Sequence, residues 1–408
     1  MAGRRRRTAD RRVTGDGRRG VTHDVVVVGG GIMGSATAYH LLKADPSLSI
    51  TVVERDPTYR YASTTLCEGN VRIQFNLEEN IRISQYTMRI LETFPDEMET
   101  AGFRPKPSPR REGNLFLVDE FGRDAALHGL ETQRSFGCEV EWLDAAAVGT
   151  EFPAFATEGL VGGTLGRSDG RVDATAMLRG YRLKAIELGA QYLEAEVDSV
   201  TVTGGRATGV ATSVGALSAG RVLIAAGAWT PDLVRPLGVH LPVQPVMRTV
   251  YVVASTVATK GLPAAFLPSG VYAIPEGERT WVMAWSLDTD PVGFDFTPAG
   301  RQRFNDVVWP ALVEHIPAFD RLQVESSWAG LYDVNTLDGN AIVGEWPEIA
   351  GLHLAVGFSG HGFQQAPAVG RYLAEDILGS SHELDLGRLG PQRVIDRQPL
   401  YEHAGRII

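Results

Sequence analysis

The chain has 408 residues, of which 44% are hydrophobic and 22% are charged, and its formal net charge is −10. This length predicts two domains, and the composition is that of a globular protein. No window holds the roughly 18 uninterrupted apolar residues of a membrane-spanning helix, so no membrane span is expected.

The first 20 residues form an arginine-rich segment with eight arginines and two aspartates. They contain no apolar run on which to fold and no apolar region of a secretory signal. A nucleic-acid or targeting arm is the alternative reading of such a charge run. We expect residues 1–20 to be a disordered, solvated tail, and we expect no nucleic-acid partner.

The first structured unit is expected to be a strand, a glycine-rich turn and a helix, written VVVVGGGIMGSATAYHL. Val25 to Val28 form a β-branched apolar run typical of a parallel strand covered on both faces. Gly29, Gly31 and Gly34 follow with the G-x-G-x-x-G spacing of a dinucleotide site. The helix beginning near Ile32 would direct free N–H groups and a positive dipole end toward phosphates.

A second strand, residues 49–53, is expected to end at Glu54, which stands 20 residues after Gly34. An acid at this distance is typical of one that binds a ribose hydroxyl, and its charge would repel a 2′-phosphate. FAD and NAD therefore remain, and NADP does not fit. Ser63 and Thr64 follow as small hydroxyl donors, which suit either phosphate oxygens or a simple turn.

The nucleotide-domain pattern returns twice, near residue 160 and after residue 328. An NAD dehydrogenase usually continues its strand–helix units without such breaks, so three separated pieces favour FAD. We expect an α/β (mixed α+β) protein with a Rossmann-like FAD-binding domain assembled from residues 21–98, 150–235 and 328–390. Residues 99–149 and 236–327 are expected to form a substrate domain, and residues 391–408 a C-terminal tail.

The substrate domain is expected to contain a mixed, largely antiparallel sheet. Residues 112–120, 245–255, 269–277 and 279–288 read as strands, because they carry partial alternation and aromatic residues between Pro and Gly turns. One face of this sheet would cover the cofactor.

Five motifs in order resemble the glycine and D-amino acid oxidase family of FAD enzymes, which includes sarcosine oxidase and dimethylglycine dehydrogenase. They are VVVVGGGIMGSATAYHL, STTLCEGNVR, RVLIAAGAW, WAGLYDVNTLDGNAIVG and GFSGHGFQQAPAVGRYLAEDIL, and they span about residues 23–380. The resemblance implies the oxidation of a C–N bond of an amino acid or N-alkyl amino acid. Hydride would pass to flavin N5, and the imine would hydrolyse in water.

The resemblance also implies a set of cofactor-binding residues. Pyrophosphate contacts would come from the first glycine turn and adenosine contacts from Glu54, Arg55 and the backbone of Val197. Gly360, His361 and Gly362 would present N–H groups from a helix N-terminus to the flavin N1 and O2 region. The full implied set is Gly29, Gly31, Ile32, Met33, Gly34, Glu54, Arg55, Ser63, Thr64, Gly69, Val197, Ala226, Gly227, Trp229, Gly330, Asp338, Gly360, His361, Gly362, Phe363 and Gln364.

Substrate positioning is expected from Arg72, Arg248, Tyr272, His361 and Gln364. A guanidinium matches a carboxylate with two parallel hydrogen bonds, so Arg72, Arg248 and also Arg279 are candidate anchors. For each arginine the alternative is a solvated side chain, and for Tyr272 it is simple packing.

Three departures from the family pattern refine the expectation. WAGLYDV has no cysteine where sarcosine oxidases attach the flavin, which predicts non-covalent FAD. Trp281 stands in our alignment where those oxidases have an oxygen-activating lysine, so the electron acceptor is either O2 or an electron carrier. Gln364 replaces a lysine that binds the substrate carboxylate.

Two further expectations concern alternatives and location. Oxidation of a 2-hydroxy acid on the same fold remains open. So does a non-catalytic FAD-binding assembly factor, because GFSGHGxQQAP and YDxNTxD are similar to a mitochondrial branch that helps assemble respiratory complex I. Cys67 and Cys138 are too few for a disulfide framework and have no metal-ligand spacing, so a cytoplasmic protein without a metal is expected.

Overall fold

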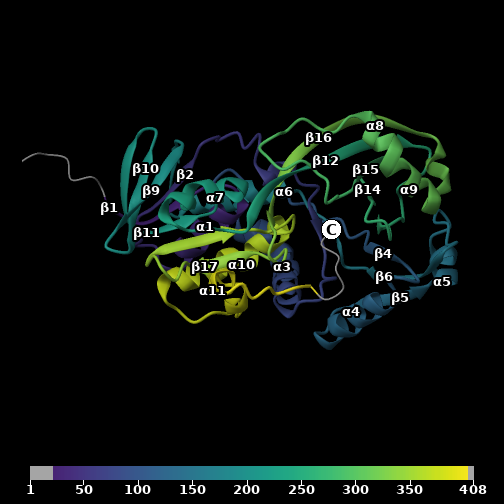
Figure 1. Cartoon of the computed structure of the whole chain (residues 1–408), viewed down its shortest axis with the longest axis horizontal. Helices are drawn as coiled ribbons and strands as arrows, with labels where there is room; N and C mark the ends of the chain where they lie inside the picture. Colours follow the sequence, from purple (N-terminus) through teal and green to yellow (C-terminus); the bar gives the residue numbers. More distant parts are fainter. Residues whose placement is uncertain (1–21, 403–408) are drawn as a thin grey trace, which may run out of the picture.

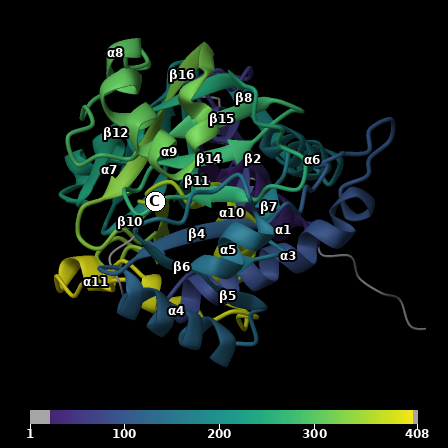
Figure 2. The same cartoon turned by 90° about the vertical axis from the view of Figure 1, so that its right-hand side faces the viewer.

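The computed structural model describes residues 22–402, and the expected disordered tail at residues 1–20 lies outside this range. Two large sheets and their helices lie side by side (Figure 1), and Figure 2 shows the second sheet from its outer side. Among the described residues no helix is long and apolar enough to cross a membrane.

The first sheet has the strand order β17-β18-β11-β1-β2-β8, with the antiparallel strands β10 and β9 added beside β11. β18, β11, β1, β2 and β8 run parallel to one another, as in a nucleotide-binding sheet, and β17 pairs with β18 in the antiparallel direction. Its strands come from three separate parts of the chain, which confirms the predicted assembly. The bounds are β1 Thr22–Val28, β2 Ile50–Glu54, β8 Gln191–Glu194, β9 Val197–Thr203, β10 Arg206–Thr212, β11 Gly215–Ile224, β17 Ile342–Glu345 and β18 Leu352–Val356.

Helices cover one face of this sheet, and a hairpin with a short helix covers the other. α1 (Ile32–Ala44), α3 (Glu78–Glu97), α6 (Ala174–Glu187) and α10 (Gly362–Leu378) pack into one apolar core with the sheet. β9, β10 and α7 (Thr230–Val234) close a second core on the opposite face. The stripe of Val369, Leu373 and Ile377 on α10 is buried in the first core, as its spacing of four residues predicted.

The second sheet has the order β16-β12-β15-β14-β13-β4-β6-β5 and is antiparallel except between β13 and β4. This arrangement confirms the predicted mixed, largely antiparallel sheet. One face packs on α5 (Ala145–Glu151) and α9 (Trp309–His315), and the other carries Phe266, Tyr272 and Ile274. The bounds are β4 Asn114–Asp119, β5 Val140–Asp144, β6 Leu160–Gly166, β12 Val243–Ser255, β13 Ala264–Phe266, β14 Tyr272–Pro275, β15 Thr280–Ala284 and β16 Leu322–Asn335.

Six further α-helices and β-strands complete the described chain. They are α2 Ser63–Leu66, β3 Asn70–Val71, α4 Arg123–Ser135, β7 Gly170–Arg171, α8 Arg301–Arg303 and α11 Gln392–Ile395. β3 pairs with β7 in a small ribbon between the domains.

Two stretches differ from the expected domain boundaries. β6 was placed in the FAD-binding domain, but it pairs with β4 and β5 in the second sheet. The expected C-terminal tail contains α11 and packs on the first domain, because Arg393 forms a buried ion pair with Asp338 at 2.9 Å. Glu402 accepts the N–H of Leu77 at 3.1 Å, just before α3.

Candidate active site

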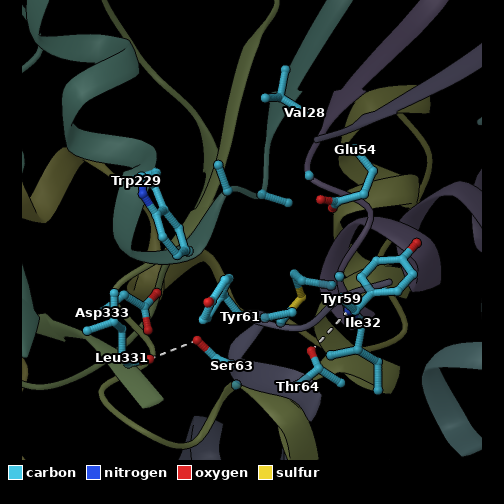
Figure 3. Close-up of a pocket in the computed structure, with 18 of the residues that line it drawn as sticks. Val28, Ile32, Glu54, Tyr59, Tyr61, Ser63, Thr64, Trp229, Leu331 and Asp333 are labelled. Carbon is cyan, nitrogen blue, oxygen red and sulfur yellow. Dashed lines mark hydrogen bonds between the residues drawn. The ribbon is translucent and has the colours of Figure 1, made fainter. Parts of the chain in front are cut away.

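A cavity of about 430 Å³ lies at the carboxyl ends of β1, β2 and β11. This end of a parallel sheet is where α/β folds bind their ligands. Figure 3 shows its lining, with Glu54 and Tyr59 on one side and Trp229 and Asp333 on the other.

The three glycines of the first turn each have a separate steric role. Gly29 has φ +97°, and a Cβ atom there would lie 2.4 Å from the carbonyl oxygen of Ala225. A Cβ at Gly34 would lie 2.0 Å from the Gly29 oxygen, so the helix can pack on the turn only without a side chain. Gly31 lines the cavity, where a Cβ atom would meet only Oγ1 of Thr64, at 3.7 Å. These contacts match the turn, approach and packing roles of the motif.

The start of α1 presents the donors that a phosphate requires. Its N-cap residue, Gly31, has no side chain to satisfy the first-turn N–H groups, so these groups and the positive helix end face the cavity. The N–H of Ile32 donates to Oγ1 of Thr64 at 3.3 Å, and Ser63 donates to the carbonyl of Leu331 at 2.8 Å (Figure 3). Small hydroxyls therefore border the same space.

Glu54 ends β2 at the edge of the cavity. Its carboxylate accepts the N–H groups of Gly30 at 2.8 Å and Asp56 at 2.9 Å, which fix its orientation. Each oxygen still has a lone pair for a ribose hydroxyl. The structure therefore places this acid where the motif predicted it.

The two ends of the cavity differ in chemistry. At one end the Arg55 guanidinium lies 3.9 Å from the ring centroid of Trp229, and Val197 lies nearby in the lining. At the other end Gly360, Gly362 and Phe363 line the wall where α10 begins. Planar groups suit an adenine, and a second helix N-terminus suits a ring that gains negative charge. This donor set fits FAD.

Most of the predicted cofactor residues line this cavity, and six do not. Those in the lining are Gly29, Gly31, Ile32, Met33, Glu54, Arg55, Ser63, Thr64, Val197, Ala226, Gly227, Trp229, Gly360, Gly362 and Phe363. Gly34 packs beneath the turn, Gly330 packs against Leu66, and Asp338 lies elsewhere. Gly69, His361 and Gln364 line a neighbouring cavity instead.

The YDVNTLD motif contributes an acid to the cavity, but it is Asp333 and not Asp338. Asp338 is bound to Arg393 and to the side chain of Asn335, so its role here is to hold the C-terminal segment. Asp333 lines the cavity and accepts the N–H of Gly357 at 2.8 Å, and burial raises its pKa to about 6. Alternate residues of β16, including Leu331 and Asp333, are buried. This alternation is the sequence signal that favours Asp333 as the acid that faces inward.

A smaller cavity of about 60 Å³ adjoins the first one. Cys67, Tyr332, Gly360 and Phe363 belong to both linings, so they form the wall between the two spaces. The smaller lining also contains Glu68, Gly69, Asn70, Arg72, Phe266, Tyr272, Ile274, His361 and Gln364. A compact space beside the end formed by α10 is suited to a small substrate.

Arg72 is a buried cation in the smaller cavity. Its guanidinium lies 4.6 Å from the Phe75 ring centroid, and Nη2 lies 3.1 Å from Nε2 of His361. Burial lowers the pKa of Arg72, yet a guanidinium remains charged in proteins. Within residues 22–402 no carboxylate forms a salt bridge with it. Arg72 is therefore available to an anionic group in the cavity.

His361 and Gln364 hold Arg72 in place. A guanidinium can only donate, so Nε2 of His361 accepts and the ring is neutral with its proton on Nδ1. Oε1 of Gln364 accepts the main-chain N–H of Arg72 at 2.8 Å. Gln364 also lines the smaller cavity, and its side chain carries no charge. The structure thus brings together Arg72, His361, Gln364 and Tyr272, as the sequence predicted.

Three other predicted positions lie outside both cavities. Arg248 pairs with the buried Asp290, which Arg303 also binds, and it donates to the carbonyl of Leu287 at 2.8 Å. Its charge is therefore already compensated. Arg279 is exposed at a turn. Trp281 is fully buried in the core on the other face of the second sheet, because neighbouring residues of β15 point to opposite faces.

Several lining residues were not predicted. Tyr59 and Tyr61 border the larger cavity, Glu68 and Phe266 the smaller, and Cys67 both. Cys67 and Glu68 stand inside the quoted motif STTLCEGNVR, so their position beside Arg72 in the chain was a usable signal. Phe266 comes from a three-residue strand that no periodic pattern marks.

The comparisons agree with this geometry. Residues 24–376 match the family model described as FAD dependent oxidoreductase. The chain belongs to this family. The cofactor prediction is thereby confirmed at the level of FAD dependence.

The chain is similar to particular members of the family. It is 33% identical to the FAD-dependent oxidoreductase domain-containing protein 1 of Xenopus laevis, covering 93% of this chain and 84% of the relative. It is 27% identical to the sarcosine oxidase subunit beta of Rhizobium meliloti, covering 85% and 82%. The crystal structure of L-proline dehydrogenase from P. horikoshii superposes with a TM-score of 0.81 at 26% identity, covering 93% of this chain and 99% of that one.

Proposed function

We propose that this protein oxidises the C–N bond of a small amino acid or N-alkyl amino acid. The observation that carries the proposal is the buried Arg72, a cation facing a small cavity that shares a wall with the FAD site. A guanidinium in an apolar enclosure binds a carboxylate with two charge-assisted hydrogen bonds. Such a bond would direct the rest of the substrate toward the shared wall.

The residues of the smaller cavity would bind and orient the substrate. Arg72 and the amide of Gln364 would bind the two carboxylate oxygens, and Phe266 and Ile274 would exclude water from the substrate. FAD in the larger cavity would supply the hydride acceptor. The start of α10 would stabilise the negative charge that reduction places beside it.

The proposed FAD is non-covalent. Cys67 is in the wall between the cavities, but burial raises the pKa of its thiol to about 12, so it remains protonated and donates to the carbonyl of Thr64 at 3.1 Å. A thiol in this state is a poor nucleophile. The described chain has two free cysteines, which is the basis for proposing a cytoplasmic protein.

The test is turnover with an artificial electron acceptor on a panel of matched acids. Glycine, sarcosine and alanine would be compared with glycolate and lactate, and the product solution assayed for 2-oxo acid together with ammonia or alkylamine, and for formaldehyde in the case of sarcosine. We expect nitrogen release from at least one amino acid and no oxidation of the hydroxy acids. Oxidation of hydroxy acids alone would establish the alternative chemistry. No turnover, with FAD bound in full, would favour a non-catalytic FAD-binding role.

A further inference from the structure

The smaller cavity contains a negative charge as well as Arg72. Glu68 is in its lining, and Oε1 accepts the hydroxyl hydrogen of Tyr272. The pKa of Tyr272 is raised well above its ordinary value, mainly by burial. Its hydroxyl therefore stays protonated and donates. The main-chain carbonyl of Glu68 accepts Nε of Arg171 at 2.8 Å. Both the backbone and the carboxylate of Glu68 are therefore held.

Glu68 forms no salt bridge within residues 22–402, although the guanidinium of Arg171 interacts electrostatically with its charge. Arg171 donates to the main-chain carbonyl of Glu68. Its guanidinium also forms a salt bridge with the carboxylate of Glu276. The second oxygen of Glu68, Oε2, has no hydrogen-bond partner in the same range. One carboxylate oxygen is thus left for a group inside the cavity.

Glu68 and Arg72 do not neutralise each other. The carboxylates that stabilise the charge of Arg72 are those of Glu402 and Asp169, which do not line this cavity. The cavity therefore presents a cation from Arg72 and a separate anion from Glu68 within a lining of mixed polar and apolar side chains. In such surroundings charges are less screened than in water, so this pair would select strongly among ligands.

We infer that Glu68 is a specificity-determining residue, which binds the cationic nitrogen of a zwitterionic substrate while Arg72 binds its carboxylate. The inference rests on the proposed oxidation of amino acids and narrows it to substrates that enter with a protonated amine. A 2-hydroxy acid could offer Glu68 a neutral hydroxyl hydrogen bond but no positive charge, so the cavity would favour the zwitterion over it.

The test uses two ligands of the same shape, (trimethylammonio)acetate and 3,3-dimethylbutanoate. Both carry a carboxylate for Arg72, but only the first has a positive nitrogen. The quaternary nitrogen has no lone pair, so neither ligand can be oxidised by hydride loss to an imine. Binding to the FAD-loaded protein is measured by isothermal titration calorimetry, with flavin content as the check that each variant is folded.

We expect the wild type to bind the zwitterion at least tenfold more tightly than the neutral analogue. Glu68→Gln should remove this preference by weakening only the zwitterion, and Glu68→Asp should restore part of it. Arg72→Met should weaken both ligands. An equal affinity of the wild type for both ligands, or a preference that survives in Glu68→Gln, would overturn the assignment. The wild-type comparison stands even where a variant does not fold.

Failure of this inference is distinguishable from failure of the proposed function. If amino acids are oxidised and Glu68→Gln leaves their KM unchanged, only the role of Glu68 is wrong. If the wild type binds 3,3-dimethylbutanoate better than the zwitterion and oxidises hydroxy acids, both are wrong.

Discussion

Arg72 and Arg248 show how burial and partners decide what an arginine does. Arg72 follows β3 and Arg248 lies within β12, and the sequence makes both candidate carboxylate anchors. Arg248 has Asp290 as its partner, whereas Arg72 has a neutral histidine and two aromatic rings. Of the two, only Arg72 forms no direct salt bridge within the described residues.

This contrast gives a matched pair of variants. Arg72→Met should raise KM for amino acid substrates about 10- to 100-fold, since hydrogen bonds to a charged group contribute about 1.5–3 kcal/mol. Arg248→Met should leave KM unchanged and lower the free energy of unfolding by about 3 kcal/mol, because it leaves Asp290 with one partner fewer. Steady-state kinetics measure KM, and urea unfolding measures stability. A raised KM in Arg248→Met together with an unchanged KM in Arg72→Met would exclude Arg72 as the anchor.

Asp169 is a fully buried carboxylate behind Arg72. It accepts the N–H of Ile73 at 2.9 Å and Nε2 of Gln74 at 3.0 Å, and burial raises its pKa to about 7. The folded protein therefore binds this proton more tightly than the unfolded chain, whose aspartate has a pKa near 3.8. The free energy of unfolding should fall as the pH rises through this window, by at most about 1.4 kcal/mol per pH unit.

The variant Asp169→Asn isolates this contribution. Urea unfolding of both proteins at pH 5, 6, 7 and 8 should show the wild type losing stability relative to the variant as the pH rises from 5 to 7. Above pH 7 the difference should level off. A difference that does not change with pH would show that Asp169 has an ordinary pKa in the folded protein.

At the scale of elements, α1 and α10 are packed closely enough that their contact requires glycine. A Cβ at Gly370 would lie 2.8 Å from Cβ of Ala36 and 3.0 Å from main-chain atoms of α1. Because both helices start at the FAD cavity, their separation sets the spacing of two helix N-termini. We therefore expect the packing of α1 against α10 to influence FAD binding.

Gly370→Val should therefore weaken FAD binding as well as the fold. Overpacking costs about 1–3 kcal/mol, and we expect a lower Tm together with about tenfold faster flavin dissociation. The control is Gly149→Ala in α5, where the nearest contact of the new Cβ is 3.5 Å from Thr157, so alanine should be tolerated. Flavin dissociation as fast in the control as in Gly370→Val, or unchanged in both, would contradict the proposed link.

Elements with a strong local signal could be predicted, and those defined by distant contacts could not. β1, the glycine turn and α1 follow from valines and glycines that are adjacent in the chain. β6 reads as a continuation of the nucleotide domain, but its partners β4 and β5 are chosen by long-range pairing. The choice between Asp333 and Asp338 likewise depended on Arg393, which comes 55 residues after Asp338.

The whole molecule is organised around the wall that its two cavities share. β16 belongs to the second sheet, yet its end supplies Tyr332 and Asp333 to the FAD cavity. Trp328 on the same strand donates to the carbonyl of Leu66 at 2.8 Å and ties α2 to the second domain. β16 therefore borders both cavities, because Tyr332 lines each of them.

The most direct test of the proposed function is the visible spectrum of the purified FAD-loaded protein, recorded while it is mixed without air with the amino and hydroxy acids named above. Amino or N-alkyl amino acids should bleach the flavin absorbance near 450 nm, a band characteristic of oxidised flavin, at rates that saturate with concentration. Readmitting air or adding an electron carrier would then identify the acceptor by the return of that band. Bleaching by hydroxy acids alone, or by none of the acids, would contradict the proposed oxidation of amino acids.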